Sequence, residues 1–227
     1  MRAIAVGFAV LALASDVCAQ SEFVLIQGAR VIDGTGAPAR DVSVRFHGDR
    51  IDAVGTDVAA PAGSRVIEAR GQTLIPGLFD LHTHLSASAV TGAPADWGKH
   101  LKAYLAAGVT SVNDFAVYGE MFEPMRQLLA GGALPGPRVN MAVRISTTGG
   151  HGTEGGWGDF MTLEANTAEQ AHARMKTALS MKPAVIKVFT DGWRYGTAPD
   201  LTSMNFETLS AIVADAHAAG IDRKSVV

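Results

Sequence analysis

From Pro76 onward, the sequence alternates between short apolar strand patterns and longer amphipathic helix patterns. Strands that alternate with helices predict consecutive βαβ units and therefore a parallel sheet. The sequence contains four such βα units, and a fifth strand would begin at Ile221. The strand patterns are LFDLHTH (78–84), TSVNDF (110–115), RVNMAVRI (138–145) and AVIKVF (184–189).

The helix patterns follow these strands at residues 96–108, 120–132, 168–181 and 205–220. The third is preceded by Thr167, which we expect to be its N-cap, and Gln170 occupies the capping-box position three residues later. The fourth closes on Gly220, a residue typical of helix C-termini.

Two parallel folds fit this pattern. A (β/α)8 barrel usually needs about 250 residues, and residues 77–227 are too few, so a barrel would be truncated to about its first four βα units. An open doubly wound sheet could close with fewer strands. No G-x-G-x-x-G motif follows the first strand, however, so a dinucleotide-binding sheet is only weakly indicated.

A different pattern precedes Pro76. Short runs with period-two alternation and many β-branched residues are separated by turn sequences such as GTGAPA and HGD. They predict a small antiparallel sheet over about Glu22–Leu74. We therefore expect a boundary between an N-terminal β domain, residues 20–75, and the βα domain, residues 76–221.

The first 19 residues have the features of a secretory signal. Arg2 supplies a positive start, Ala3–Ala14 an apolar core, and VCA a cleavage site before Gln20. Export to the periplasm or outside the cell is therefore expected; the alternative is a buried N-terminal helix. Cleavage would remove Cys18, the only cysteine, so disulfides play no part in the expected fold.

The last six residues, DRKSVV (222–227), do not continue the strand that Ile221 should open. They resemble the translation of a common short-read sequencing adapter. We hypothesise that they are not biological and that the reading frame was cut short; the alternative is a short natural tail.

Composition excludes two classes of partner. The chain is 48% hydrophobic with a formal net charge of −3 and has no stripe of Lys and Arg, which argues against nucleic-acid binding. Its longest apolar run, Ala3–Ala14, is shorter than the roughly 20 residues of a membrane-spanning helix. We therefore expect no membrane association once the signal is removed.

The first βα strand ends in the pair His82 and His84. Residues two apart on a strand point to the same face, so both imidazoles and the carboxylate of Asp80 are expected on one face at the carboxyl end of the strand. Two such imidazoles can bind one Zn²⁺-like ion, with the carboxylate as a ligand or as a partner of a ligand. The alternative is two polar residues where a strand becomes a loop.

Lys187 is the only polar residue of the apolar strand AVIKVF. A buried ammonium is costly unless it is paired, so a salt bridge or an extended side chain that reaches water would explain it structurally. The functional alternative is that burial lowers its pKa and leaves a reactive amine. Such an amine can take up CO2 to form a carbamate that bridges two metal ions.

Five motifs, taken in order and spacing, resemble the amidohydrolase superfamily, in particular its imidazolonepropionase-like and Xaa-Pro or Xaa-Arg dipeptidase-like branch. The resemblance covers Val24 to Gly220. The motifs are GARVIDGTG, IPGLFDLHTHL, AAGVTSVNDFA, TTGGHG and VIKVFTDG.

The resemblance implies a composite β-sandwich beside a (β/α)8 TIM barrel that holds one or two divalent metal ions, for which zinc is expected. His82 and His84 match the metal-binding histidines of strand 1, and Lys187 matches the carboxylated lysine of strand 4. His151, in TGGHG, matches a residue that faces the substrate; the alternative is a histidine held within its loop.

The family mechanism is attack of a metal-activated hydroxide on an amide-type carbon, with proton transfer to the leaving nitrogen by an aspartate of strand 8. That aspartate, and the histidines of strands 5 and 6, would lie beyond Gly220, so the catalytic residues cannot be assigned in this chain. The four remaining histidines suit surface or packing roles: His47, His100, His172 and His217.

Loops after the second and fourth strands should line the mouth of the site, where specificity is often determined. Tyr195 is the candidate there for substrate contact, beside Asp191, Trp193 and Arg194, and Asp114 follows the second strand. The alternative is that these residues only stabilise their loops.

The expected function is therefore hydrolysis of carbon–nitrogen bonds in small amides, cyclic amides or dipeptides, by a parent protein of which this chain is an inactive N-terminal part. Two alternatives stay open. One is an esterase, lactonase or phosphotriesterase of the same superfamily. The other is a non-catalytic half-barrel that binds a partner or forms a homo-oligomer.

Overall fold

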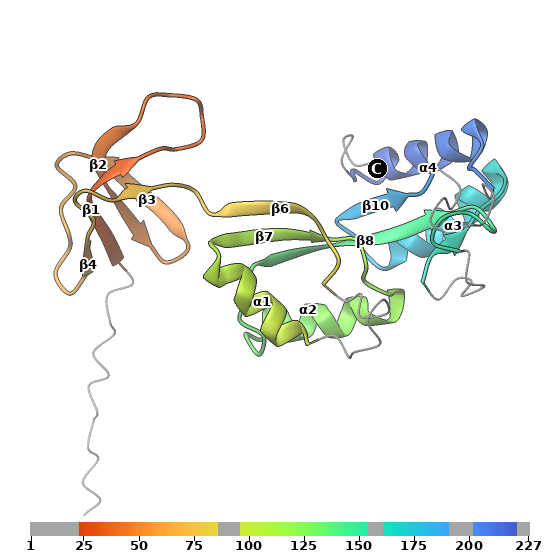
Figure 1. Ribbon diagram of the computed structural model, residues 1–227, viewed down its shortest axis with the longest axis horizontal. Coiled ribbons are helices and arrows are strands. Elements are labelled where there is room, and N and C mark those ends of the chain that lie inside the picture. Colours follow the sequence, from red (N-terminus) through yellow and green to blue (C-terminus); the bar gives the residue numbers. More distant parts are fainter. Residues whose placement is uncertain (1–22, 86–95, 154–160, 191–201, 222–227) are drawn as a thin grey trace, which may run out of the picture. The chain divides into compact units, whose positions relative to one another are not determined.

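A computed structural model describes residues 23–85, 96–153, 161–190 and 202–221, and it divides the chain into two units, residues 1–76 and 77–227 (Figure 1). The signal sequence expected at residues 1–19 and the tail at 222–227 lie outside the described residues. Within the described part, no helix combines the length and the apolar character needed to cross a membrane.

The N-terminal unit is a five-stranded sheet in which β1 is central. β1 pairs antiparallel with β2, and β2 pairs antiparallel with β3. The expectation of a purely antiparallel sheet is wrong, because β4 and β5 both pair with β1 in parallel, on its other side. The strands are β1 (Phe23–Val31), β2 (Arg40–His47), β3 (Arg50–Gly55), β4 (Arg65–Glu68) and β5 (Thr73–Leu74).

The core of this unit consists of small and β-branched side chains on the central strands. Ala29 is fully buried, and Val42 and Val44 of β2 pack with it beside Ala69. These residues come from the alternating apolar positions of the sequence, which is why the strands themselves are predictable from the pattern.

The second unit contains the four expected strands, all parallel and in the order β6, β7, β8, β10 (Figure 1). The order follows the sequence without reversal, so the sheet has no topological switch point of the kind found in doubly wound folds. A short strand that the sequence did not predict, β9, pairs in parallel with the carboxyl end of β8. The strands are β6 (Leu78–Thr83), β7 (Val109–Asp114), β8 (Arg138–Ser146), β9 (Leu163–Glu164) and β10 (Val185–Val188).

Each long strand is followed by a helix, as the sequence predicts. Side chains cap the amino ends of three of them: Asp96 accepts a hydrogen bond from the backbone of Lys99, Thr167 from Gln170, and Asn205 from Thr208. The helices are α1 (Trp97–Ala106), α2 (Phe122–Ala130, after a 3-10 turn at Gly119–Met121), α3 (Ala168–Ser180) and α4 (Phe206–Ala218).

The core of the second unit lies between the sheet and these helices. Met125 of α2, Met175 of α3 and Ile212 of α4 are buried against Ile145 of β8 and Val188 of β10. A smaller cluster forms around Leu101, Val112 and Leu85 under α1. The helices thus cover one face of the sheet and leave the other for the polar residues described next.

Candidate metal centre

The two histidines of H-x-H lie at the carboxyl end of β6. Their ring centres are 5.3 Å apart with planes inclined by 37°, and the His82 ring packs 4.6 Å from the ring of Phe115, at the end of β7. One metal ion bound at about 2.0–2.1 Å by a nitrogen of each ring can lie between rings at this separation. The expected convergence of the two imidazoles is therefore present.

Asp80 does not join them, which corrects the expectation drawn from strand alternation. The pairing of β6 with β7 is irregular between Asp80 and Thr83, so the side chains there do not keep simple alternation. The Asp80 carboxylate instead accepts a hydrogen bond from the backbone N–H of His82, at 3.1 Å, and interacts with the hydroxyl of Tyr104 on α1. Asp80 therefore supports the backbone of the histidines.

Lys187 on β10 is only 6% exposed and faces the same region. Its ammonium lies 4.5 Å from the ring centre of Phe189 and 5.4 Å from that of Phe115, the ring against which His82 packs. A salt bridge, one of the structural alternatives, is not among the contacts described: Lys187 lies over two aromatic faces, which attract a cation weakly. The ring of Phe115 therefore contacts both the Lys187 ammonium and the His82 ring.

These surroundings favour uncharged nitrogen atoms. Partial burial, followed by the charge of Lys187, lowers the pKa of His84 to about 4, and the same two causes lower the pKa of His82, with Asp80 acting in the opposite direction. Burial and then the charge of Arg144 lower the pKa of Lys187. Because metals bind the neutral imidazole and CO2 adds to a neutral amine, these shifts suit a metal site.

His151 lies in the loop after β8, and its ring packs 4.4 Å from the ring of Phe189. Gly152 makes this approach possible: its φ is +86°, and a Cβ there would be 2.9 Å from the Phe189 ring. The glycine-rich loop therefore brings His151 close to the residue that covers Lys187. Tyr195, with Asp191, Trp193 and Arg194, lies outside the described residues.

Two residues that sequence reasoning missed or undervalued are close to this centre. Arg144 of β8 lies opposite Lys187 in the parallel pairing and is 9% exposed. Its signal was present, because it is a lone cation in the apolar run MAVRI, as Lys187 is in its own strand. Asp114 is fully buried and accepts hydrogen bonds from the backbone N–H groups of Leu85 and Ala116.

The other histidines have structural surroundings, as expected. His47 stacks on Phe23, at 4.2 Å between ring centres, and His172 of α3 bonds Asp215 of α4 at 2.8 Å. His100 approaches the carbonyl of Leu85 at 3.4 Å and so borders the H-x-H segment from α1. His217 lies in the last turn of α4.

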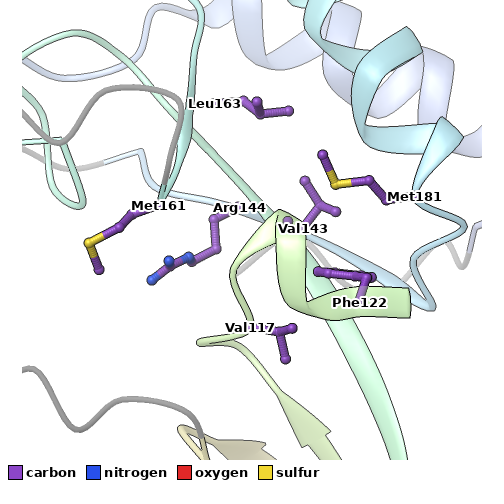
Figure 2. A pocket seen from close by; sticks show the side chains of 8 residues that line it. Val117, Phe122, Val143, Arg144, Met161, Leu163 and Met181 are labelled. Carbon is purple, nitrogen blue, oxygen red and sulfur yellow. The ribbon is translucent and has the colours of Figure 1, made fainter. Parts of the chain in front are cut away.

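The two hollows described in the second unit do not include the histidines in their lining. A cavity of about 20 Å³ is lined by side chains such as Phe122, Leu163 and Met181. The guanidinium of Arg144 is directed away from these three side chains (Figure 2). The cavity can hold about one water molecule. An open groove of about 610 Å³ borders the start of β8 at Arg138 and Val139, at the opposite end of the strand from Arg144.

Within the described residues, no three His, Cys, Asp or Glu side chains are close enough together to hold a metal ion. The described donors that fit a metal are therefore the two imidazoles, and Lys187 is a further nitrogen group that faces the same region. Such a set is chemically suited to a zinc-like ion.

No protein-family model matches the chain. Several curated proteins match short segments of the chain, among them two bacterial enzymes. The N-acyl-D-aspartate deacylase of Alcaligenes xylosoxydans xylosoxydans is 49% identical over 69 residues, which cover 30% of this chain and 14% of the deacylase. The dihydroorotase of Streptomyces coelicolor is 48% identical over 61 residues, which cover 27% of this chain and 13% of that enzyme.

Solved structures extend the likeness to most of the chain. The crystal structure of a Xaa-Pro dipeptidase with bound methionine in the active site superposes with a TM-score of 0.71 at 23% identity, covering 88% of this chain and 55% of the dipeptidase. This likeness establishes the fold. The chain spans about half the length of this structural neighbour, and its matches to the curated relatives cover a smaller share of them.

Proposed function

The chain belongs to the amidohydrolase superfamily, and on that premise we propose that its parent protein is a metal-dependent hydrolase of carbon–nitrogen bonds in small molecules. The names of the relatives support this reaction class, since deacylases, dihydroorotases and dipeptidases act on amide-type bonds. Acyl amino acids, cyclic amides and dipeptides are accordingly the proposed substrate class.

The observation that carries the proposal is the meeting of three nitrogen side chains from two separate strands. His82 and His84 reach the carboxyl end of β6, and Lys187 of β10 reaches Phe115, on which His82 packs. The carboxyl ends of the strands are where the active sites of parallel α/β barrels lie.

His82 and His84 would hold the metal, for which zinc is proposed, and their lowered pKa values keep both rings in the form that binds it. When bound, the metal lowers the pKa of a water molecule and polarises the scissile carbonyl. Lys187 would join as a carbamate: its neutral amine forms an N–C bond to CO2 and releases one proton, which yields a carboxylate able to bridge to a second ion. His151, whose ring packs on Phe189, is the proposed substrate-contacting residue.

We also propose that the four βα units are the first half of a (β/α)8 barrel and that the N-terminal sheet is part of a β-sandwich. The unreversed strand order and the 55% coverage of the Xaa-Pro dipeptidase support this arrangement. The ligands and proton donor expected from the second half would then be supplied by the rest of the parent, and the 227-residue chain alone would be inactive. The signal-like pattern of residues 1–19 supports export to the periplasm or beyond.

The test is to extend the reading frame in the source DNA, express the full-length parent, and measure its metal content and its activity on acyl amino acids, dipeptides and cyclic amides. We expect metal-dependent turnover of at least one of these, loss of metal in His82→Ala, and loss of a second ion in Lys187→Ala. His172→Ala, a histidine paired with Asp215 on the helices, is the matched control. Turnover of esters, lactones or phosphotriesters alone would contradict the substrate class, and unchanged metal in both variants would contradict the site.

A further inference from the structure

We infer that Asp114 is a positioning residue that holds the H-x-H segment in the geometry required for metal binding. The inference rests on the proposed function, because it concerns how the two proposed ligands are oriented. It assigns a role to a buried carboxylate that sequence reasoning placed only in a loop.

Asp114 is fully buried, with no exposed surface, and one of its oxygens accepts two backbone hydrogen bonds. The first comes from Leu85, directly after His84, at 3.2 Å; the second comes from Ala116, at 2.9 Å. A buried carboxylate is costly unless such bonds satisfy it. Its position is therefore closely determined, and it joins the segment after β6 to the segment after β7.

The backbone on either side of the histidines is held in the same way. Asp80 accepts the N–H of His82 at 3.1 Å. Thr83 accepts the N–H of Phe115 through its carbonyl, at 2.9 Å, and donates its hydroxyl to the carbonyl of Asn113, at 3.0 Å. Hydrogen bonds to polar groups thus hold the chain at residues 82, 83 and 85. These bonds to neighbouring backbone and side-chain groups set the direction of the two imidazoles.

Asp114 and the imidazoles make different contacts where β6 meets the end of β7. Thr83 and Asp114 are partners in the parallel pairing of β6 with β7, whereas the His82 ring packs on Phe115, the residue after Asp114. The hydroxyl of Tyr104 on α1 interacts with Asp80, and its pKa is raised by burial and by the charges of Asp80 and Asp114. Helix α1 therefore lies beside the carboxyl groups of Asp80 and Asp114.

Loss of the Asp114 carboxylate would leave the N–H of Leu85 without this acceptor and free His84 to turn. Partners that orient metal ligands typically contribute about 10-fold to 100-fold in metal affinity. Asn at this position keeps the accepting oxygen and should preserve most of the metal affinity, whereas Ala removes the oxygen. A role confined to folding would instead lower stability and leave the affinity of the folded protein unchanged.

The experiment measures Zn²⁺ binding to the 227-residue chain by equilibrium dialysis for the wild type, Asp114→Ala, Asp114→Asn and His84→Ala. Thr167→Ala, which removes the cap of α3, is the control for loss of one side-chain-to-backbone hydrogen bond on another element. We expect Asp114→Ala to weaken Zn²⁺ binding by about 10-fold to 100-fold, Asp114→Asn to bind nearly as the wild type does, and Thr167→Ala to bind unchanged.

The outcomes distinguish an error in the proposed metal site from an error in the positioning role of Asp114. If His84→Ala binds Zn²⁺ as well as the wild type, the proposed metal site is wrong; if His84→Ala loses binding while Asp114→Ala keeps it, the positioning role is wrong. Metal-free NMR provides the second measurement for a chain that binds Zn²⁺ weakly. There Asp114→Ala should accelerate exchange of the Leu85 amide and remove the ring contacts between His82 and His84, and unchanged spectra at these residues would overturn the inference.

Discussion

Arg144 of β8 and Lys187 of β10 lie directly opposite each other in the parallel pairing, so two cationic side chains are adjacent on the same face of the sheet. Both are buried, at 9% and 6% exposure. A cation beside a buried ammonium disfavours its charged form, and the pKa of Lys187 is lowered by burial and then by Arg144. The pair therefore disfavours the ammonium form of Lys187 relative to an exposed lysine.

Replacing Arg144 with Met should raise the pKa of Lys187, because it removes a positive charge and leaves burial as the remaining cause of the shift. The change is measured by NMR titration of the Lys187 side chain. Arg138→Met is the matched control: Arg138 lies on the same strand, bonds Ser111 instead, and is not a cause of the shift. An unchanged Lys187 titration in Arg144→Met would contradict this electrostatic coupling.

The metal-free protein should lose stability as the pH falls through the range in which the unfolded histidine titrates. His84 has a pKa of about 4 in the fold and about 6.5 when unfolded, so between these values the unfolded chain binds more protons. Stability is therefore highest above about pH 6.5, decreases towards pH 4, and loses nothing further from this residue below that value.

The measurement is the urea midpoint at several pH values in EDTA, for the wild type and His84→Asn. His84→Asn should show a flatter dependence between pH 4 and pH 6.5, and His217→Asn, at the exposed end of α4, should follow the wild type. Equal slopes for the wild type and His84→Asn would show that the His84 pKa is not lowered.

The regular elements of the second unit were predictable because each is a local pattern. The strand around Lys187 and the cap at Thr167 both follow from neighbouring residues, and both are found. Strand pairing is not a local property. Which strands pair in parallel with β1 depends on where the chain returns to the N-terminal sheet, and the alternation of apolar residues does not encode this. The sequence therefore identified most strands of that sheet and the antiparallel pairs β1–β2 and β2–β3, and misjudged the parallel pairing of β4 and β5 with β1.

In the candidate site, too, the sequence predicts some residues and not others. His82, His84 and Lys187 could be found because polar residues in apolar strands stand out. The position of Asp80 could not, because it depends on an irregular pairing with β7. The role of Asp114 depends on a backbone group 29 residues away in the sequence, and no spacing rule indicates such a contact.

Gly77 should tolerate no side chain, since a Cβ there would lie 2.2 Å from the Thr110 hydroxyl oxygen and 2.4 Å from its methyl group. We expect Gly77→Ala to lower the free energy of unfolding by about 1–3 kcal/mol, the usual effect of overpacking. Thr110→Gly removes all three clashing atoms, so the double variant should be less destabilised than the sum of the single ones. Chemical denaturation of the four proteins gives the coupling energy, and strict additivity would contradict the contact.

Strand β6 should make the 227-residue chain self-associate. In the part of the chain that the structure describes, β6 pairs only with β7, and its side chains Phe79 and Leu81 are 64% and 66% exposed. An apolar edge strand of this kind is a template for pairing with another chain. Phe79→Lys with Leu81→Lys should place charges along this edge and shift the chain towards monomer, as measured by sedimentation velocity over a range of concentrations.

Phe206→Lys is the matched control for this prediction, because Phe206 is 78% exposed but lies alone at the start of α4. It should leave the sedimentation profile unchanged, whereas a general effect of added charge would shift both variants alike. A wild-type chain that stays monomeric at high concentration would contradict the role of the edge. Association that survives the double substitution would place the contact on another surface.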